Sequence, residues 1–133
     1  MSRLTVFLAR SIGLFTVLLV VAFLARGSAI VETTVADRPV MLVYAITSLA
    51  MGIAMVLGHN VWSGGALPMA VTLVGWLILA KGLLLLFLVP EAVSGMFHQI
   101  RYAEHYYLLL TPALVIGLYL TWAGFTAATL HKP

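Results

Sequence analysis

Long runs of apolar residues separated by short polar segments make up most of this chain of 133 residues. A hydrocarbon layer about 30 Å thick is crossed by about 20 helical residues. Four runs reach that length, and they cover residues 4–25, 39–57, 67–89 and 106–127. None of them alternates apolar and polar residues as a membrane β-barrel does, and backbone groups in lipid must form hydrogen bonds within their own segment. The pattern therefore predicts four transmembrane helices.

The composition extends this prediction to the whole chain. Hydrophobic residues make up 63% and charged residues only 8% of the chain, whereas soluble domains carry about 25% charged residues. We therefore expect an all-α polytopic membrane protein, with residues 1–133 forming a single four-helix bundle. An even number of crossings places both termini on one side, together with the connection at 58–66. Basic residues are spread over both sides, so the positive-inside rule favours cytoplasmic termini only slightly.

The first run is interrupted by charge, because only residues 11–25 separate Arg10 from Arg26. That stretch spans about 22 Å of helix. Arg10 is therefore expected to lie inside the helix and to extend its guanidinium toward the lipid head groups. A cleaved signal peptide is the alternative, but Ala25-Arg26-Gly27 is a poor cleavage site.

A short interfacial helix is predicted between the third and fourth runs, because the polar residues of this connection share one helical face and the apolar residues another. The polar face carries Glu91, Ser94, His98, Arg101 and His105. Arg101 is spaced as a helical neighbour of both Glu104 and His105, so a small polar cluster is expected there. His98, Arg101, Glu104 and His105 are candidates for contacting head groups or for docking the extramembrane domain of a partner.

Lys81 is the ionisable residue farthest from an end of its predicted span, at about 12 Å of helix from Val89. A charge at such a depth indicates a functional site by default. The flexible side chain either reaches the interface or lines a polar cavity, where it would hold a lipid phosphate or another anionic ligand. In the second case, the polar side chains available from the spans are Thr47, Ser48, Thr72 and Thr111.

The connection between the second and third runs carries the densest local pattern, Gly58-His59-Asn60-Val61-Trp62-Ser63-Gly64-Gly65. Glycine suits a helix end, Asn and paired Gly suit a tight turn, and Trp suits the aromatic belt of a membrane protein. His59, Asn60 and Trp62, together with Lys81, are the candidate residues for binding a ligand or lipid.

This turn and the span that follows it, with VTLVGW at residues 71–76 and Lys81-Gly82, resemble a family of small bacterial four-span membrane proteins. These proteins share an HNVW turn followed by a VTLxGW…KG span. The resemblance implies a four-helix fold and a location in the bacterial inner membrane. The family has no established activity, so the resemblance transfers no catalytic residue.

Small residues at helical spacing predict where helices approach one another closely. Three pairs have this spacing: Ala50 and Ala54, Gly75 and Gly82, and Gly117 and Gly124. A weak similarity at an offset of 65 residues aligns Gly52 with Gly117. It predicts two helical hairpins, each a span, a polar connection and a span, related as a parallel repeat.

Several kinds of chemistry are excluded or disfavoured. The chain contains no cysteine, which excludes thiol–disulfide exchange, iron–sulfur ligation and thiolate catalysis. Phosphate-binding loops, metalloprotease motifs and nucleophile elbows are also missing. The predicted topology puts two histidines on each side, His59 with His131 and His98 with His105, so neither a metal nor a cofactor is expected. The scattered basic residues form no stripe for nucleic acid.

These features favour a non-enzymatic integral membrane protein, either an accessory or scaffold subunit or a small homo-oligomer. Its expected partners are membrane lipids and other membrane subunits or further copies of the chain. A small transporter or channel is the first alternative. Proton-coupled exporters rely on an acidic residue inside the membrane, whereas all four acidic residues of this chain fall in predicted connections: Glu32, Asp37, Glu91 and Glu104. The second alternative is a subunit that holds a quinone or pigment through Trp76, Trp122, Tyr119 or His59.

Overall fold

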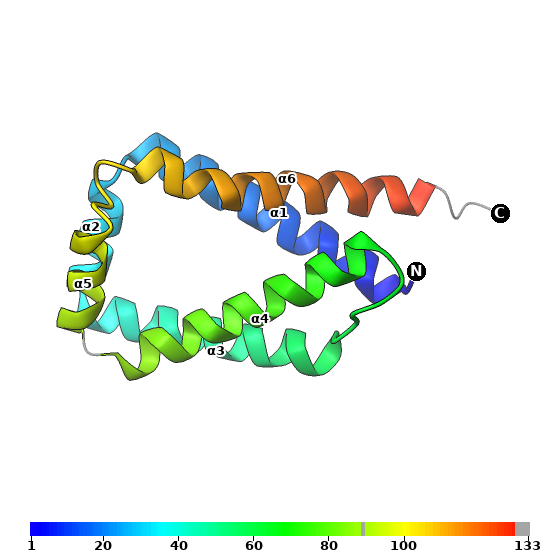
Figure 1. The fold of residues 1–133 in the computed structure, drawn as a ribbon, viewed down its shortest axis with the longest axis horizontal. Helices are drawn as coiled ribbons and strands as arrows, with labels where there is room; N and C mark the ends of the chain where they lie inside the picture. The colour runs from blue at the N-terminus through cyan, green and yellow to red at the C-terminus, as the bar shows by residue number, and fades with distance from the viewer. Residues whose placement is uncertain (89, 130–133) are drawn as a thin grey trace.

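The computed structural model describes residues 1–88 and 90–129, and this part of the chain is all-helical (Figure 1). Four of its helices are long and apolar enough to cross a membrane: α1 (Arg3–Arg26), α3 (Arg38–Gly58), α4 (Ala66–Phe87) and α6 (Tyr106–Thr129). They confirm the four predicted spans, with bounds that agree within two residues. The predicted end of the third span, Val89, lies outside the described residues.

Two short helices, α2 (Ala29–Ala36) and α5 (Pro90–Gln99), connect the long ones. The interfacial helix predicted for the second of these connections is confirmed up to Gln99. Beyond that residue the chain turns, and Arg101 has a φ of 50°, so the predicted polar face does not continue as a helix to His105. The helix α2 was not predicted from the sequence.

The long helices form two pairs, in which α1 lies along α6 and α3 lies along α4 (Figure 1). The pairs meet at the end of the molecule where α1 begins and α6 ends. They diverge toward the other end, where α2 and α5 lie between them (Figure 1). The bundle is therefore V-shaped, and the predicted hairpins are wrong as packing units, because α2 and α5 separate the helices that they connect.

This pairing is nevertheless compatible with an internal repeat. The units α1–α2–α3 and α4–α5–α6 have the same order of a long, a short and a long helix. A two-fold axis that exchanges the units would also exchange the α1–α6 pair with the α3–α4 pair. The parallel repeat stays a prediction, now with an arrangement of helices that fits it.

Glycine brings the backbones of α3 and α4 together. A β carbon at Gly52 would lie 2.5 Å from the Cα atom of Leu79, and one at Gly82 would lie 2.5 Å from the backbone nitrogen of Leu49. Such distances are far below van der Waals contact, so only glycine fits at these positions. A helix pair can pack this closely where small residues face the partner.

The predicted glycine contacts are confirmed. A β carbon at each of these glycines would lie within 3.1 Å of a neighbouring helix: Gly75, Gly82, Gly117 and Gly124. The prediction for Ala50 and Ala54 is wrong, since both are exposed. The buried face of α3 carries Ala45, Ser48 and Gly52 instead, because the register of α3 on α4 turns the two alanines outward.

The α1–α6 pair is held in the same way and also by Arg10. A β carbon at Gly13 would lie 2.5 Å from the backbone nitrogen of Thr121. Arg10 lies within α1 as expected, but its Nε donates a hydrogen bond of 3.1 Å to the Gly124 carbonyl. Its guanidinium also lies 4.7 Å from the centre of the Phe125 ring. The side chain is therefore bound to α6 rather than extended freely toward head groups.

Two apolar clusters show that the helix pairs are in contact at one end of the molecule and apart at the other. The first draws residues from all four long helices: Ala9, Ile12, Met55, Leu67, Val71 and Leu120. The second contains Val20, Tyr106 and Leu110, with partly buried residues from α1, α2, α6 and the turn after α5, and none from α3 or α4. The two pairs thus share a core at their converging end only.

Candidate functional site

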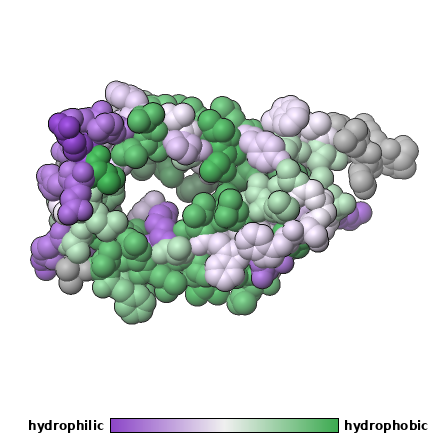
Figure 2. All heavy atoms as spheres, viewed as in Figure 1, coloured by the Kyte–Doolittle hydropathy of each residue, from purple (hydrophilic) through white to green (hydrophobic). Residues whose placement is uncertain are grey.

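A cleft of about 320 Å³ lies where the helix pairs diverge. Figure 2 shows a hollow between the two pairs, bordered largely by apolar (green) side chains. Most of the cleft wall is apolar, with contributions from α1, α3, α4 and α5 that include Phe23, Met41, Leu84, Leu85, Val93 and Phe97. The polar side chains that line it are Thr34, Tyr44, Lys81 and Tyr102.

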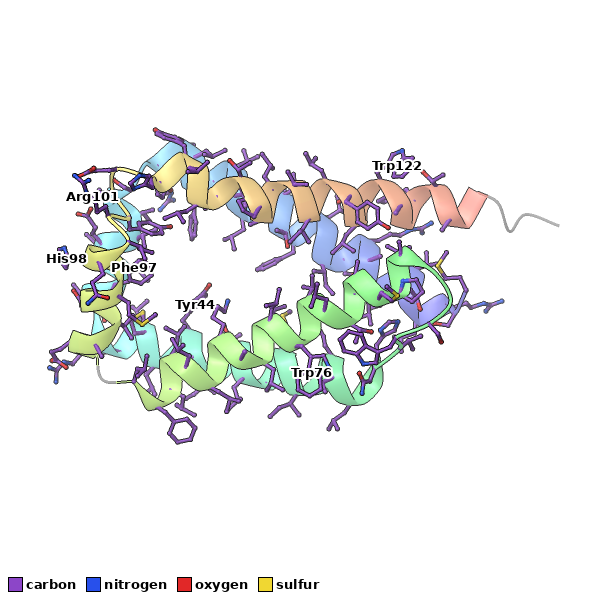
Figure 3. All side chains as sticks on the ribbon, in the orientation of Figure 1. Tyr44, Trp76, Phe97, His98, Arg101 and Trp122 are labelled. Atoms are coloured by element: carbon purple, nitrogen blue, oxygen red, sulfur yellow. The ribbon has the colours of Figure 1, made fainter. Side chains whose placement is uncertain are left out.

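Lys81 and Tyr44 form a contact at the wall of this cleft. The Lys81 ammonium donates a hydrogen bond of 3.1 Å to the Tyr44 hydroxyl and lies 4.5 Å from the centre of the Tyr44 ring. Tyr44 points from α3 into the space between the helix pairs (Figure 3). Each residue lies about 9 Å of helix from the end of its helix that faces α2 and α5. The two side chains therefore meet at the same depth.

The polar neighbours predicted for Lys81 have other contacts. The Thr47 hydroxyl donates to the Val43 carbonyl at 2.8 Å, and the Thr111 hydroxyl donates to the Tyr107 carbonyl at 2.9 Å. Ser48 and Thr72 are buried and do not line the cleft. Tyr44 was missed because its meeting with Lys81 depends on the register between α3 and α4, which hydropathy does not give.

The helices α2 and α5 close the diverging end of the cleft, and we call them the roof. An exposed ion pair between Arg38 and Glu91 joins the start of α3 to the start of α5. The Asp37 carboxylate accepts a hydrogen bond of 3.1 Å from the Val40 backbone N–H and so caps α3. Exposed ion pairs contribute about 0–1 kcal/mol each. The roof is therefore positioned mainly by the packing of α2 against α1, α3 and α5 and of Val31 against Val20, Tyr106 and Leu110.

The residues predicted to dock a partner lie on the outer side of the roof. His98, Arg101 and Glu104 line an open pocket of about 500 Å³ together with Glu32 of α2. Arg101 and Glu104 form the expected ion pair, at 2.9 Å. His105 stands apart from this pocket, with its Nδ1 atom 3.2 Å from the Arg101 carbonyl oxygen. His98 and Arg101 point away from the cleft, whereas Phe97 points into it (Figure 3).

His59 lies at the opposite end of the molecule and is 3% exposed. Its Nε2 atom is 2.9 Å from the Thr5 hydroxyl, and its Nδ1 atom is 3.2 Å from the Thr72 hydroxyl. Both ring nitrogens are therefore engaged, one with α1 and the other with α4. The histidine joins the two helix pairs where they converge.

Asn60 and Trp62 form a separate group beside His59. The side-chain amide oxygen (Oδ1) of Asn60 accepts hydrogen bonds from the indole N–H groups of Trp62 at 2.7 Å and Trp76 at 3.4 Å. None of these residues lines the cleft. The structure thus separates the predicted ligand-binding residues, with Lys81 at the cleft and His59, Asn60 and Trp62 at the converging end.

Within residues 1–88 and 90–129, no group of three His, Asp or Glu side chains is placed to hold a metal ion. His131, the fourth histidine considered in the sequence, lies outside the described residues. The cleft accordingly offers one ammonium group and several hydroxyl groups to a bound molecule.

Tyr102, in the turn between α5 and α6, lines both the cleft and the outer pocket. Its ring packs edge-on against Phe97 at 4.9 Å and against Tyr106 at 5.6 Å. Burial raises the pKa of the Tyr102 phenol above its ordinary value of 10.0, and the neighbouring phenols of Tyr106 and Tyr44 raise it further. Tyr102 therefore remains a neutral phenol beside the roof.

This raised pKa predicts that stability falls in alkaline solution. Below about pH 9 the Tyr102 phenol is protonated in both states, so it adds no pH dependence. As the pH rises through 10, the unfolded chain loses this proton first and the folded state is destabilised. We expect Tyr102→Phe to weaken the fall in thermal stability between pH 8 and 10.5, measured by circular dichroism in detergent. An unchanged fall would contradict the assignment.

Comparison of the chain with protein-family models, with curated proteins and with solved structures found no match. The class of protein is therefore defined by the structure: an all-helical chain whose four apolar helices are consistent with a multi-pass membrane protein.

Proposed function

We propose that this chain is a non-enzymatic integral membrane protein that serves as an accessory subunit, holding another membrane component between its two helix pairs. The cleft is the observation that carries this proposal. It lies between helices that could span a membrane, and its wall is largely apolar. Pockets that bind small molecules are usually about 300–1,000 Å³ and mostly apolar, with a few polar groups. A cleft of about 320 Å³ falls within that range.

The placement of charged groups supports binding rather than catalysis. All four acidic residues lie outside the long helices, in α2, at the cap of α3, in α5 and in the turn after it: Glu32, Asp37, Glu91 and Glu104. The described part of the cleft wall thus places no carboxylate beside Lys81 to act as a general base. The same arrangement disfavours proton-coupled export, which uses acidic residues inside the membrane.

We further propose that the protein resides in the bacterial inner membrane with cytoplasmic termini. The converging end of the V, which carries the start of α1 and the connection through His59, would then face the cytoplasm (Figure 1). The roof and its outer pocket, lined by His98, Arg101 and Glu104, would face the opposite side. Lipids inside the cleft and a membrane subunit at the outer pocket are the partners that this arrangement favours.

Native mass spectrometry of the protein, extracted in mild detergent from its host membrane, tests the accessory role. We expect a second membrane component, either lipid or protein, bound in stoichiometric amount. A bare monomer would overturn the proposal. A homo-oligomer without other components would replace it by self-association, for which the exposed Ala50 and Ala54 of α3 permit close helix contact. Solute flux in liposomes that Lys81→Met abolishes would assign the protein to the transporters instead.

A further inference from the structure

Lys81 has no carboxylate partner within the part of the chain that the structure describes. The two ion pairs found there join Arg38 to Glu91 and Arg101 to Glu104, and both are exposed. The contacts of the Lys81 ammonium are with the hydroxyl and the ring face of Tyr44. An ammonium has three donors, so one such hydrogen bond leaves it capacity for an acceptor.

The depth of Lys81 makes an anionic partner favourable. The residue lies about 9 Å of helix below the end of α4, under the roof formed by α2 and α5. Lys81 is exposed to the open cleft, so inside a bilayer its charge would face lipid, which is costly unless an opposite charge or several hydrogen bonds compensate it. Phosphate and carboxylate groups accept strong, charge-assisted hydrogen bonds from an ammonium. The Tyr44 hydroxyl, which already contacts Lys81, can also turn its proton toward such an oxygen.

The apolar wall of the cleft indicates the chemistry of the rest of the bound molecule, apart from its anionic group. The cleft that Lys81 and Tyr44 line is otherwise walled largely by apolar side chains, among them Met41, Leu84, Leu85 and Val93. An acyl chain can lie against such a wall without a desolvation cost, because lipid tails are as apolar as these side chains. A free inorganic anion would leave this wall without a partner. The combination of one cation and an apolar wall fits an amphiphile with an anionic head.

The shape of the bundle provides a lateral route. The two helix pairs share a core only at their converging end, and the hollow between them reaches the surface on the face shown in Figure 2. An acyl chain can therefore lie between the pairs and extend into the bilayer, while its head group stays beneath the roof at Lys81.

We propose that the cleft binds an anionic amphiphile, a lipid with one phosphate or carboxylate head group, through Lys81 and Tyr44, with its acyl chain between the two helix pairs. This proposal rests on the proposed function, because it names the membrane component that the cleft holds. The charge complementarity at Lys81 distinguishes it from binding of neutral lipid or of a partner's helix.

The test uses the full-length protein in nanodiscs that contain phosphatidylglycerol and phosphatidylcholine with identical acyl chains. The protein is released from the nanodiscs in the gas phase, and the lipids that remain bound to it are identified by native mass spectrometry. We expect the wild-type protein to retain phosphatidylglycerol in preference to phosphatidylcholine by about tenfold, because phosphatidylcholine neutralises the same phosphate with its own quaternary ammonium and so carries no net charge to complement Lys81. Lys81→Met should abolish this preference, Lys81→Arg should keep most of it, and Tyr44→Phe should reduce it a few-fold.

Arg3→Met is the matched control, because it removes one positive charge from an exposed position at the converging end of the molecule. It should leave the lipid preference unchanged. Because the wild-type comparison of the two lipids needs no substitution, the proposal stays testable if Lys81→Met does not fold.

The outcomes separate this inference from the function on which it rests. Retention of both lipids without preference, or a preference that Lys81→Met leaves intact, would overturn the anionic site and leave the binding cleft in place. Displacement of phosphatidylglycerol by millimolar inorganic phosphate would assign the site to a free anion and overturn the amphiphile. Retention of no lipid and no protein partner would overturn both proposals.

Discussion

Replacing Gly52 by alanine is expected to lower the free energy of unfolding by roughly 1–3 kcal/mol, the cost of overpacking a tight interface. The added β carbon would lie 2.5 Å from the backbone nitrogen and Cα atom of Leu79. Backbone atoms cannot rotate away as a side chain can, so α3 and α4 would have to separate. The decrease can be measured by titration with a denaturing detergent, followed by circular dichroism.

Gly58→Ala is the matched control for this prediction. Gly58 ends the same helix, and a β carbon there would meet no atom within 4 Å. Alanine at this position is expected to be neutral or slightly stabilising, because it reduces the conformational freedom of the unfolded chain. Equal stability of the Gly52→Ala and Gly58→Ala proteins would show that α3 and α4 do not pack as described.

Tyr106→Ala is expected to be the most destabilising substitution in the α1–α6 pair, at about 3–5 kcal/mol. The side chain is 1% exposed, and its hydroxyl donates a hydrogen bond of 2.6 Å to the Phe23 carbonyl. Truncation therefore leaves a cavity and removes one of the two hydrogen bonds that the Phe23 carbonyl accepts, the other coming from the Gly27 backbone N–H. Tyr106→Phe keeps the ring and should cost only about 0.5–1.5 kcal/mol, the net value of one hydrogen bond.

Tyr107→Ala serves as the comparison for Tyr106, because the neighbouring residue has the same side chain and is 65% exposed. Its removal leaves no cavity, so its effect on thermal stability in detergent should be small. If the two alanine variants unfold at the same temperature, Tyr106 does not join α6 to α1 in the way the structure indicates.

Hydropathy was sufficient to predict the four long helices, because membrane-spanning segments must be both apolar and about 20 residues long. The pairing of these helices could not be predicted in the same way. A helix that is apolar on all sides presents no face that identifies its partner. The sequence placed contacts at Gly75 and Gly117 correctly but could not show that Ala50 and Ala54 point outward, since that depends on the register of α3 on α4.

The same limit applies to the candidate site. The depth of Lys81 was predicted from its position along the third span, whereas Tyr44 lies 37 positions away in sequence and meets it only after α3 and α4 pair. His59 was recognised as part of a dense pattern, but its buried position depends on hydrogen bonds to Thr5 and Thr72 from two other helices. The cleft exists because α2 and α5 hold the helix pairs apart at one end. It could not be predicted, because α2 was not recognised in the sequence.

The central claim is that lipid chains occupy the space between the two helix pairs, and fluorescence quenching in bilayers tests it most directly. The chain has no cysteine, so Leu85→Cys places a single environment-sensitive label on the cleft wall. Leu118→Cys places one on the exposed face of α6 that carries Trp122, as a positive control for contact with lipid. We expect lipids brominated on their acyl chains to quench both labels and aqueous iodide to quench neither. Quenching of the Leu85 position by iodide, or its protection from both quenchers, would contradict a lipid-filled cleft.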